Sequence, residues 1–166
     1  TTKITGNIRT SGISSHGVEI AKLSDKDSIN NTTTITGNIR TSGVAAYGLY
    51  NNLTNSNTTN LTGNISTTGA GAYGLYMNNS DSNITNLTGN ITTTEDNAVG
   101  LYLVGSDSNT ITINGDIITS GTVGNAEPVL LENSDSNTFI LSGNVQSLGG
   151  DQAISIDADS DANTFN

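Results

Sequence analysis

One short motif occurs six times along this chain and constrains what the chain can fold into. The motif reads Ile-Thr-Gly-Asn-Ile around Gly6. It recurs with small changes around Gly37, Gly63, Gly89, Gly115 and Gly143, so the glycines are 31, 26, 26, 26 and 28 residues apart. A period of this length is typical of solenoids and other repeat arrays, in which each unit buries its apolar face against its neighbours.

Each repeat reads as three short β-strands separated by turn residues. In the first strand, Ile35, Ile39 and Thr41 alternate with polar residues, which is the period of two expected when one face is buried. The second strand follows sequences such as Ala-Tyr-Gly-Leu-Tyr, and one aliphatic residue per repeat predicts an inward column: Val18, Leu49, Leu75, Leu101, Val129 and Ile154. The third strand follows a polar turn whose asparagine lies six residues before the next motif glycine: Asn31, Asn57, Asn83, Asn109 and Asn137, with Asn163 in the matching place of the last repeat.

These patterns predict an all-β fold, a single-stranded parallel β-helix (β-solenoid). We expect about six coils of ~26 residues with three short strands per coil, because no helical periodicity interrupts them. The whole chain, 1–166, is expected to form one domain without obvious caps, with coils near 1–31, 32–57, 58–83, 84–109, 110–137 and 138–166. Stacked Asn and Thr columns are expected to form hydrogen-bonded ladders along the axis. The surplus residues of the first coil, 21–27, are expected to protrude as a loop.

Charge and composition exclude several classes of partner. The net charge of −10 argues against nucleic acid, and no apolar run approaches the roughly 20 residues of a membrane helix. No cysteine is present, so neither a disulfide framework nor a thiolate metal site is expected, and no cofactor is predicted. All five basic residues fall in the first 40 positions beside three acids, giving 5 − 3 = +2, whereas the other twelve acids follow without a base. One end is therefore mildly basic and the other strongly acidic.

The repeat also resembles a known family. Gly-Asn-Ile-x-Thr-x-Gly, followed by Ala-Tyr-Gly-Leu-Tyr and a Ser-Asp-Ser-Asn turn, is similar to the repeats of bacterial autotransporter passengers and related β-helical surface adhesins. The resemblance covers the whole chain. It implies an extracellular, cell-surface, right-handed parallel β-helix, and it transfers no catalytic residue to this sequence.

The two ends predict self-association. Read tail to head, the segment 161–166 followed by 1–6 resembles an ordinary internal repeat junction, and the acidic last coil would meet the basic first coil. We therefore expect a structural subunit of a surface fibre that stacks head to tail through open first and last coils. The expected subunit interface comprises Thr2, Lys3, Ile4, Arg9, Ile154, Ile156, Asp157, Asp159, Asp161 and Phe165. The alternative is a segment of a longer passenger, in which all junctions match each other.

Recognition of glycans or of a host surface is a second functional class. Tyr50, Tyr76 and Tyr102 form a column one residue after the inward aliphatic column, so they are expected to face outward, and Tyr47 and Tyr73 form another. Exposed aromatic rings stack on sugars, but such a ladder also stabilises a sheet by packing against itself. This column is the ligand-facing candidate of an adhesin.

Metal binding and catalysis have weaker signals. Asp81, Asp107 and Asp135 recur in one turn and are calcium candidates, although Asx-turns explain the same sequence without a metal. Acids within 151–161 are numerous enough to pair as in a polysaccharide lyase or hydrolase, but they lie in a turn-rich segment without aromatic platforms. His16, the only histidine, has no recurring Ser or Asp beside it and is expected to be a loop residue. We therefore expect no enzyme and no catalytic residue.

A third alternative is an ice-binding face. It would use the threonine columns Thr36, Thr62 and Thr88, or Thr41, Thr67, Thr93 and Thr119. Such faces need regular rows of threonine, and Asn and Arg interrupt the rows here.

Overall fold

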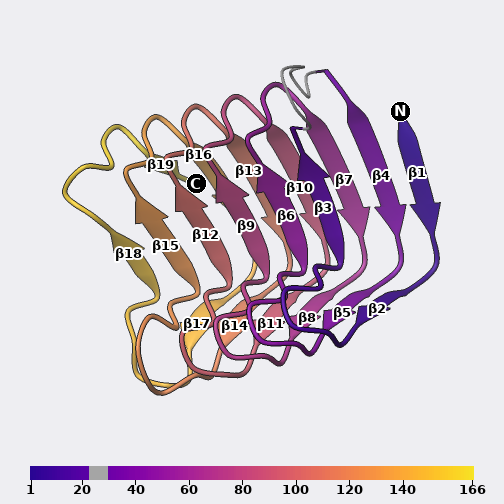
Figure 1. Ribbon diagram of the computed structural model, residues 1–166. Helices are drawn as coiled ribbons and strands as arrows, with labels where there is room; N and C mark the ends of the chain where they lie inside the picture. Colours follow the sequence, from indigo (N-terminus) through magenta and orange to yellow (C-terminus); the bar gives the residue numbers. More distant parts are fainter. Residues whose placement is uncertain (23–29) are drawn as a thin grey trace.

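The chain winds into a parallel β-solenoid (Figure 1). The computed structural model describes residues 1–22 and 30–166, and within these residues it contains nineteen short strands and no helix. Three strands per coil are joined by turns, so the predicted fold class is confirmed. Residues 23–29, which include most of the predicted loop, lie outside the described residues.

Strands from successive coils stack into three parallel sheets. The first sheet contains β1 (Thr2–Thr5), β4 (Thr32–Thr36), β7 (Thr58–Thr62), β10 (Ile84–Thr88), β13 (Thr110–Asn114), β16 (Thr138–Leu141) and β19 (Thr164–Phe165). The second contains β2 (Ile8–Thr10), β5 (Ile39–Thr41), β8 (Ile65–Thr67), β11 (Ile91–Thr93), β14 (Ile117–Thr119) and β17 (Val145–Ser147). The third contains β3 (Val18–Ala21), β6 (Leu49–Asn52), β9 (Leu75–Asn78), β12 (Leu101–Val104), β15 (Val129–Glu132) and β18 (Ile154–Ile156).

The register of the sheets equals the spacing of the motif glycines. Ile4 pairs with Ile35, an offset of 35 − 4 = 31, and Ile35 pairs with Leu61, an offset of 61 − 35 = 26. Equivalent residues of successive repeats therefore lie directly above one another, as the sequence predicted.

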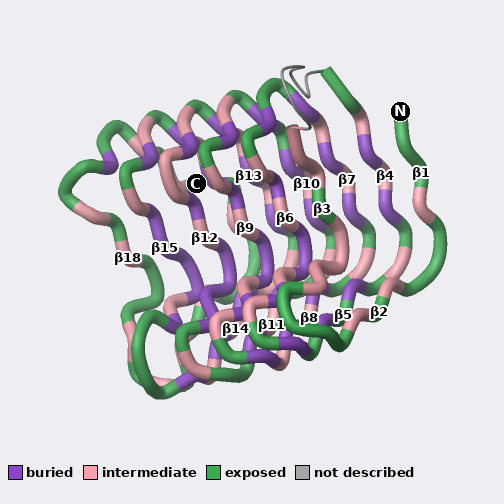
Figure 2. Tube along the Cα trace, in the orientation of Figure 1, coloured by how far each residue is buried: buried purple, intermediate pink, exposed green. Residues whose placement is uncertain are grey.

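The core consists of inward aliphatic columns running along the axis. Leu49, Leu75, Leu101 and Val129 are at most 1% exposed and occupy one column of the third sheet. Complete burial of such side chains stabilises a fold by about 1.5–3 kcal/mol each. The column predicted from the sequence is thus confirmed as inward. In the two end coils its members are only partly covered, and Figure 2 shows buried residues concentrated in the middle coils.

The motif glycine is required because successive coils approach closely at this corner. Gly89 has φ +143°, and a Cβ atom there would lie 2.2 Å from the carbonyl oxygen of Gly63. The same 2.2 Å approach recurs between Gly37 and Gly6, where only the later glycine of the pair is constrained. A Cβ at Gly6 would have nothing within 4 Å. The close approach is therefore polar: it excludes a Cβ at the glycine of the later coil and not at the glycine of the earlier one.

Hydrogen-bonded ladders run beside the core, as predicted. The buried Asn83 accepts the backbone N–H of Asn57 at Oδ1 (2.9 Å) and donates from Nδ2 to the carbonyl of Thr54 (2.8 Å). Asn109 and Asn137 repeat this arrangement one and two coils later.

One threonine column lies inside the solenoid. Thr41, Thr67, Thr93 and Thr119 are 0% exposed. The Thr67 and Thr93 hydroxyls donate to the carbonyls of Ala72 and Ala98, both at 2.6 Å. Because this column is buried, the ice-binding alternative is wrong for these four residues. A hydroxyl at an inward position is tolerated because a turn carbonyl accepts its hydrogen bond.

Candidate functional site

An aromatic ladder containing all five tyrosines covers part of the third sheet. Tyr47 stacks on Tyr73 with ring centroids 4.9 Å apart and planes 1° from parallel. Tyr50, Tyr76 and Tyr102 form the neighbouring column, with centroids 5.0 and 5.1 Å apart. The two columns also meet edge to face, for example Tyr73 against Tyr76 at 5.1 Å. The predicted column of Tyr50, Tyr76 and Tyr102 is therefore present and half-buried.

Within each column the rings cover one another's faces. A ring between two coil neighbours, such as Tyr76, has both faces covered, by Tyr50 and Tyr102. This geometry matches self-packing of the ladder, and a sugar would meet ring edges along most of its length. Burial raises the pKa of Tyr76 and of Tyr102 well above the ordinary value. The Tyr102 hydroxyl donates to Oε2 of Glu132 at 2.5 Å, and this bond raises the pKa of the hydroxyl further.

His16 extends the ladder by one ring. Its imidazole stacks on Tyr47 with centroids 4.6 Å apart, and Nδ1 accepts the backbone N–H of Tyr47 at 3.0 Å. Partial burial lowers the pKa of His16. His16 lies between β2 and β3, outside the strands, as expected for a loop residue. Sequence analysis missed its stacking, although His16 is 31 residues before Tyr47, which is the offset of the first two coils.

The carboxylates of Glu127, Glu132 and Asp151 lie near the Tyr102 end of the aromatic ladder. Burial raises the pKa of Glu127, and the nearby Asp151 and Glu132 raise it further. Of the acids in 151–161, Asp157 is committed to local contacts. It accepts the Ser160 hydroxyl at Oδ1 (2.5 Å) and the Asn133 N–H at Oδ2 (3.0 Å). One Asp157 oxygen therefore serves its own turn and the other binds the preceding coil. The carboxylate pairing of a polysaccharide-degrading enzyme remains a prediction.

The calcium candidates form a ladder of their own. Asp81 Oδ1 accepts the N–H of Asp107 at 2.9 Å, and Asp107 Oδ1 accepts the N–H of Asp135 at 2.7 Å. Asp135 Oδ1 accepts the N–H of Asp161 at 2.6 Å. Backbone amides of the next coil thus occupy one oxygen of each carboxylate. These bonds join residues 26 or 28 positions apart, so they form a ladder between coils and are not the local bonds of Asx-turns. Within residues 1–22 and 30–166, no three His, Cys, Asp or Glu side chains are grouped so that they could hold a metal ion.

The two end faces expose core side chains. At the first coil, Thr2, Ile4, Val18 and Ile20 line a hollow of about 280 Å³. At the last coil, Ile154 is 37% and Ile156 44% exposed, and Phe165 is half-buried with its ring 4.6 Å from that of Phe139. Of the remaining residues expected at the interface, Thr2, Lys3, Arg9, Asp159 and Asp161 are exposed and Asp157 is half-buried.

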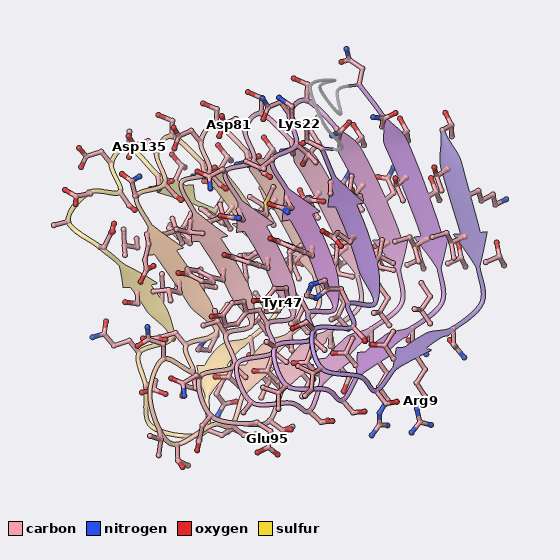
Figure 3. All side chains as sticks on the ribbon, viewed as in Figure 1. Arg9, Lys22, Tyr47, Asp81, Glu95 and Asp135 are labelled. Atoms are coloured by element: carbon pink, nitrogen blue, oxygen red, sulfur yellow. The ribbon has the colours of Figure 1, made fainter. Side chains whose placement is uncertain are left out.

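Charges of the two ends share an edge of the solenoid. Figure 3 shows Lys22, Asp81 and Asp135 along one edge and Arg9 on the opposite side. The row of Asp81, Asp107 and Asp135 ends at Asp161 in the last coil. Arg9 therefore has no part in this row of charges.

A groove of about 360 Å³ lies on the outer face of β2 and β5. Arg9 and Arg40 line it together with Asn7, Asn38, Asn64 and Ser66. Sequence analysis assigned Arg9 to the subunit interface and missed its pairing with Arg40, although both occupy the middle of an Ile-Arg-Thr triplet in the repeat.

Comparisons with known proteins identify no relative. No family model, no curated protein and no solved structure matches the chain. In the part of the chain that the structure describes, no helix has the length and apolar content to span a bilayer.

Proposed function

We propose that the protein is a non-enzymatic, extracellular structural subunit, a β-solenoid that stacks head to tail with further copies in a surface fibre. The observation that carries the proposal is the partial exposure of the same inward columns at both ends, with Val18 and Ile20 on one face and Ile154 and Ile156 on the other. Both faces also present unpaired strand edges, which pair readily with another chain. The repeat's resemblance to autotransporter passengers supports the cell-surface location.

The direction of the glycine contact supports one polarity of stacking. Each later motif glycine lies against the carbonyl group of the motif glycine one coil earlier. A Cβ built at Gly143, for example, would lie 2.2 Å from the carbonyl oxygen of Gly115. In a head-to-tail stack, Gly6 of one copy takes the equivalent place against Gly143 of the preceding copy. The exposed Asn ladder continues in the same way. Oδ1 of Asp116 accepts the N–H of Asn144 at 2.8 Å, and Asn144 would accept the N–H of Asn7 in the next copy.

The charged edge supports the same polarity. Asp161, at the end of the aspartate row, would approach the edge that carries Lys22 in the next copy. Complementary charge of this kind mainly determines orientation and association rate, and salt weakens it.

The register also shows that residues 1–3 obstruct a continuous stack. Thr2 occupies the same column of the first sheet as Thr33, and Phe165 occupies the column of Phe139, which is equivalent through the intervening strands. If β2 and β3 of one copy extend β17 and β18 of another, residues 1–3 therefore compete with 164–166 for one position. Stacking requires one of the two segments to leave the sheet.

Electron microscopy of the chain over a range of protein and salt concentrations tests the proposal. We expect thin unbranched filaments that lengthen with concentration and shorten in high salt. Deletion of residues 1–3 removes the competition without removing a buried side chain, so it is expected to promote assembly. Short rods at every concentration, with and without residues 1–3, would contradict the fibre and favour a segment of a longer passenger.

A point variant distinguishes stacking from general aggregation. Gly6→Ala adds a Cβ that meets nothing within 4 Å in a single chain but would collide with the preceding copy. Gly71→Ala is the matched control, because Gly71 also has positive φ (+62°) and open space, away from the end faces. We expect Gly6→Ala to abolish filaments and Gly71→Ala to leave them. Equal effects of the two variants would argue against this contact.

The second candidate function is glycan recognition by an adhesin. The observation that favours it is the groove on β2 and β5 that Arg9 and Arg40 line, which is formed within one chain and is therefore independent of assembly. An activity screen on acidic and neutral polysaccharides tests the non-enzymatic part of the proposal, since degradation of any of them would overturn it.

A further inference from the structure

We propose that the groove on the outer face of β2 and β5 binds oxyanion groups, sulfate or carboxylate, carried along a polysaccharide chain. The two residues expected to hold these groups are Arg9 and Arg40, which are exposed and pair in register on adjacent parallel strands. The inference rests on the second candidate function proposed above, glycan recognition, and names the chemical groups that the groove would bind.

The pairing of two arginines is unfavourable in the chain alone. Their Cα positions are one strand spacing apart, about 4.8 Å, and like charges directly opposite in a sheet destabilise it. The next residue in this column is Ser66, so the in-register neighbours of Arg40 are a second arginine and a serine. No carboxylate in register balances the pair. An oxyanion between the guanidinium groups would relieve this repulsion and accept charge-assisted hydrogen bonds.

The asparagines beside the arginines present donors. Oδ1 of Asn7 accepts the N–H of Asn38 at 2.9 Å, and Oδ1 of Asn38 accepts the N–H of Asn64 at 2.8 Å. Oδ1 of Asn64 accepts the N–H of Asn90 at 2.8 Å. Because these bonds hold each amide oxygen against the backbone, the Nδ2 group is the part of each amide that remains for a ligand. Guanidinium groups are also donors only. The arginine and asparagine side chains of the groove therefore present donors, which suits a ligand rich in acceptors.

The extent of the groove favours a polymer over a single ion. Its lining residues come from three successive coils, from Asn7 to Asn64, which span roughly 10 Å along the axis. Nucleic acid is a poor fit, since affinity for it depends on neutralising many phosphates and this chain has five basic residues and a net charge of −10. The acidic remainder of the chain would repel a polyanion elsewhere. Binding is therefore expected at this one face, through a few charged groups spaced along a glycan.

Binding to two immobilised polymers tests the site, with neutral dextran as the reference surface. Dextran sulfate supplies sulfate groups without carboxylates and polygalacturonate supplies carboxylates without sulfate, so the two surfaces distinguish the sources of the oxyanion. Assays use the Gly6→Ala chain, so that failure of assembly and failure of this site are separable. Variants are Arg9→Gln, Arg40→Gln and the double substitution. The matched control is Lys3→Gln, which removes the same charge from an exposed residue of the same coil on another sheet.

We expect retention on at least one acidic polymer and not on dextran, with weaker binding as salt rises. The double substitution is expected to weaken binding at least about tenfold and Lys3→Gln by less than about twofold, because rim charges contribute little individually. Two results would overturn the proposal. One is the absence of binding to both polymers above the dextran level. The other is an equal loss in Lys3→Gln and the arginine variants, which would indicate attraction to net charge and not to this groove.

Discussion

The backbone N–H of Asn109 donates to Oδ1 of Asn137, 28 residues later, over 2.8 Å. The same Asn137 amide donates from Nδ2 to the carbonyl of Ser106 at 2.9 Å, so one buried side chain satisfies two backbone groups of the preceding coil. The polar turns of this solenoid are thereby tied to each other without a metal or a disulfide.

Asn109→Ala is expected to destabilise the fold by about 2–4 kcal/mol. The substitution leaves the N–H of Asn83 and the carbonyl of Ser80 without their side-chain partner, and an unsatisfied buried group costs about 1–3 kcal/mol. Urea denaturation followed by circular dichroism measures the loss. Asn64→Ala is the control. It removes a bond to the exposed Asn90 N–H, which water replaces, so a cost below about 1 kcal/mol is expected. Similar costs for the two variants would contradict the role of burial.

Asn51→Leu is expected to stabilise the fold by about 1 kcal/mol. Asn51 is 2% exposed and lies between Ile20 and Met77 in an inward column. Its Oδ1 has no hydrogen-bond partner among the described residues. Replacement by an apolar side chain of similar size removes that penalty and adds aliphatic packing. The thermal midpoint checks this, with Asn52→Leu at the adjacent half-exposed position as the control. A lower midpoint for Asn51→Leu would show that the amide makes a necessary contact.

Gly89→Ala is expected to cost at least about 3 kcal/mol, because the added Cβ would lie 2.2 Å from the Gly63 carbonyl oxygen and both coils would have to separate. Gly6→Ala tests the contribution of positive φ alone, because Gly6 has φ +120° and nothing within 4 Å of an added Cβ, with an expected cost of about 1–3 kcal/mol. The difference between the two denaturation midpoints isolates the close approach of the coils. If the two variants lose equal stability, the corner is more compliant than the structure indicates.

Stability is expected to fall as pH rises above about 10. Burial raises the pKa of Tyr47, Tyr73 and Tyr76 above the ordinary value of 10.0, so the folded state holds these protons after the unfolded chain has released them. A raised pKa contributes stability that is fully present below the unfolded value and is lost as pH rises through the folded one. Denaturation midpoints measured from about two pH units below to about one pH unit above the ordinary tyrosine pKa of ~10 give the slope.

The control for this pH dependence is Tyr76→Phe, which keeps the ring and removes the ionisable group. We expect it to flatten the alkaline slope. Absorbance of tyrosinate in the folded protein provides a second test, since ionisation near pH 10 before any unfolding would contradict the raised pKa values.

Periodicity was sufficient to predict the fold and most of its columns. A strand period of two, repeated at fixed spacing, determines which residues face inward and which are stacked, and Leu49, Leu75 and Leu101 follow it. Side-chain geometry within a column was beyond that reasoning. The sequence indicated a tyrosine ladder, but it could not show that the rings cover each other's faces or that His16 joins them. Asn51 breaks the apolar pattern of its column, and only the packed neighbours reveal its missing partner.

The groove was accessible to sequence analysis in principle. Arg9 and Arg40 are 31 residues apart, the offset of the first two coils, and comparison of the triplets around them would have paired them. The charge balance of the first 40 residues does not reveal a basic face, because it sums the charges on all sides of the coil. The donor character of the neighbouring asparagines depends on where each Oδ1 points, which the repeat pattern does not specify.

The constant register makes the length of this molecule a stepwise quantity. Duplication of one 26-residue unit, such as the segment from Gly63 to Thr88, would insert a coil whose two neighbours already have the matching surfaces. Each such event would lengthen the rod by about 4.8 Å and leave every other coil unchanged. The length of the rod can therefore change by whole coils through duplication or deletion of repeats, without any change to the packing of the remaining core.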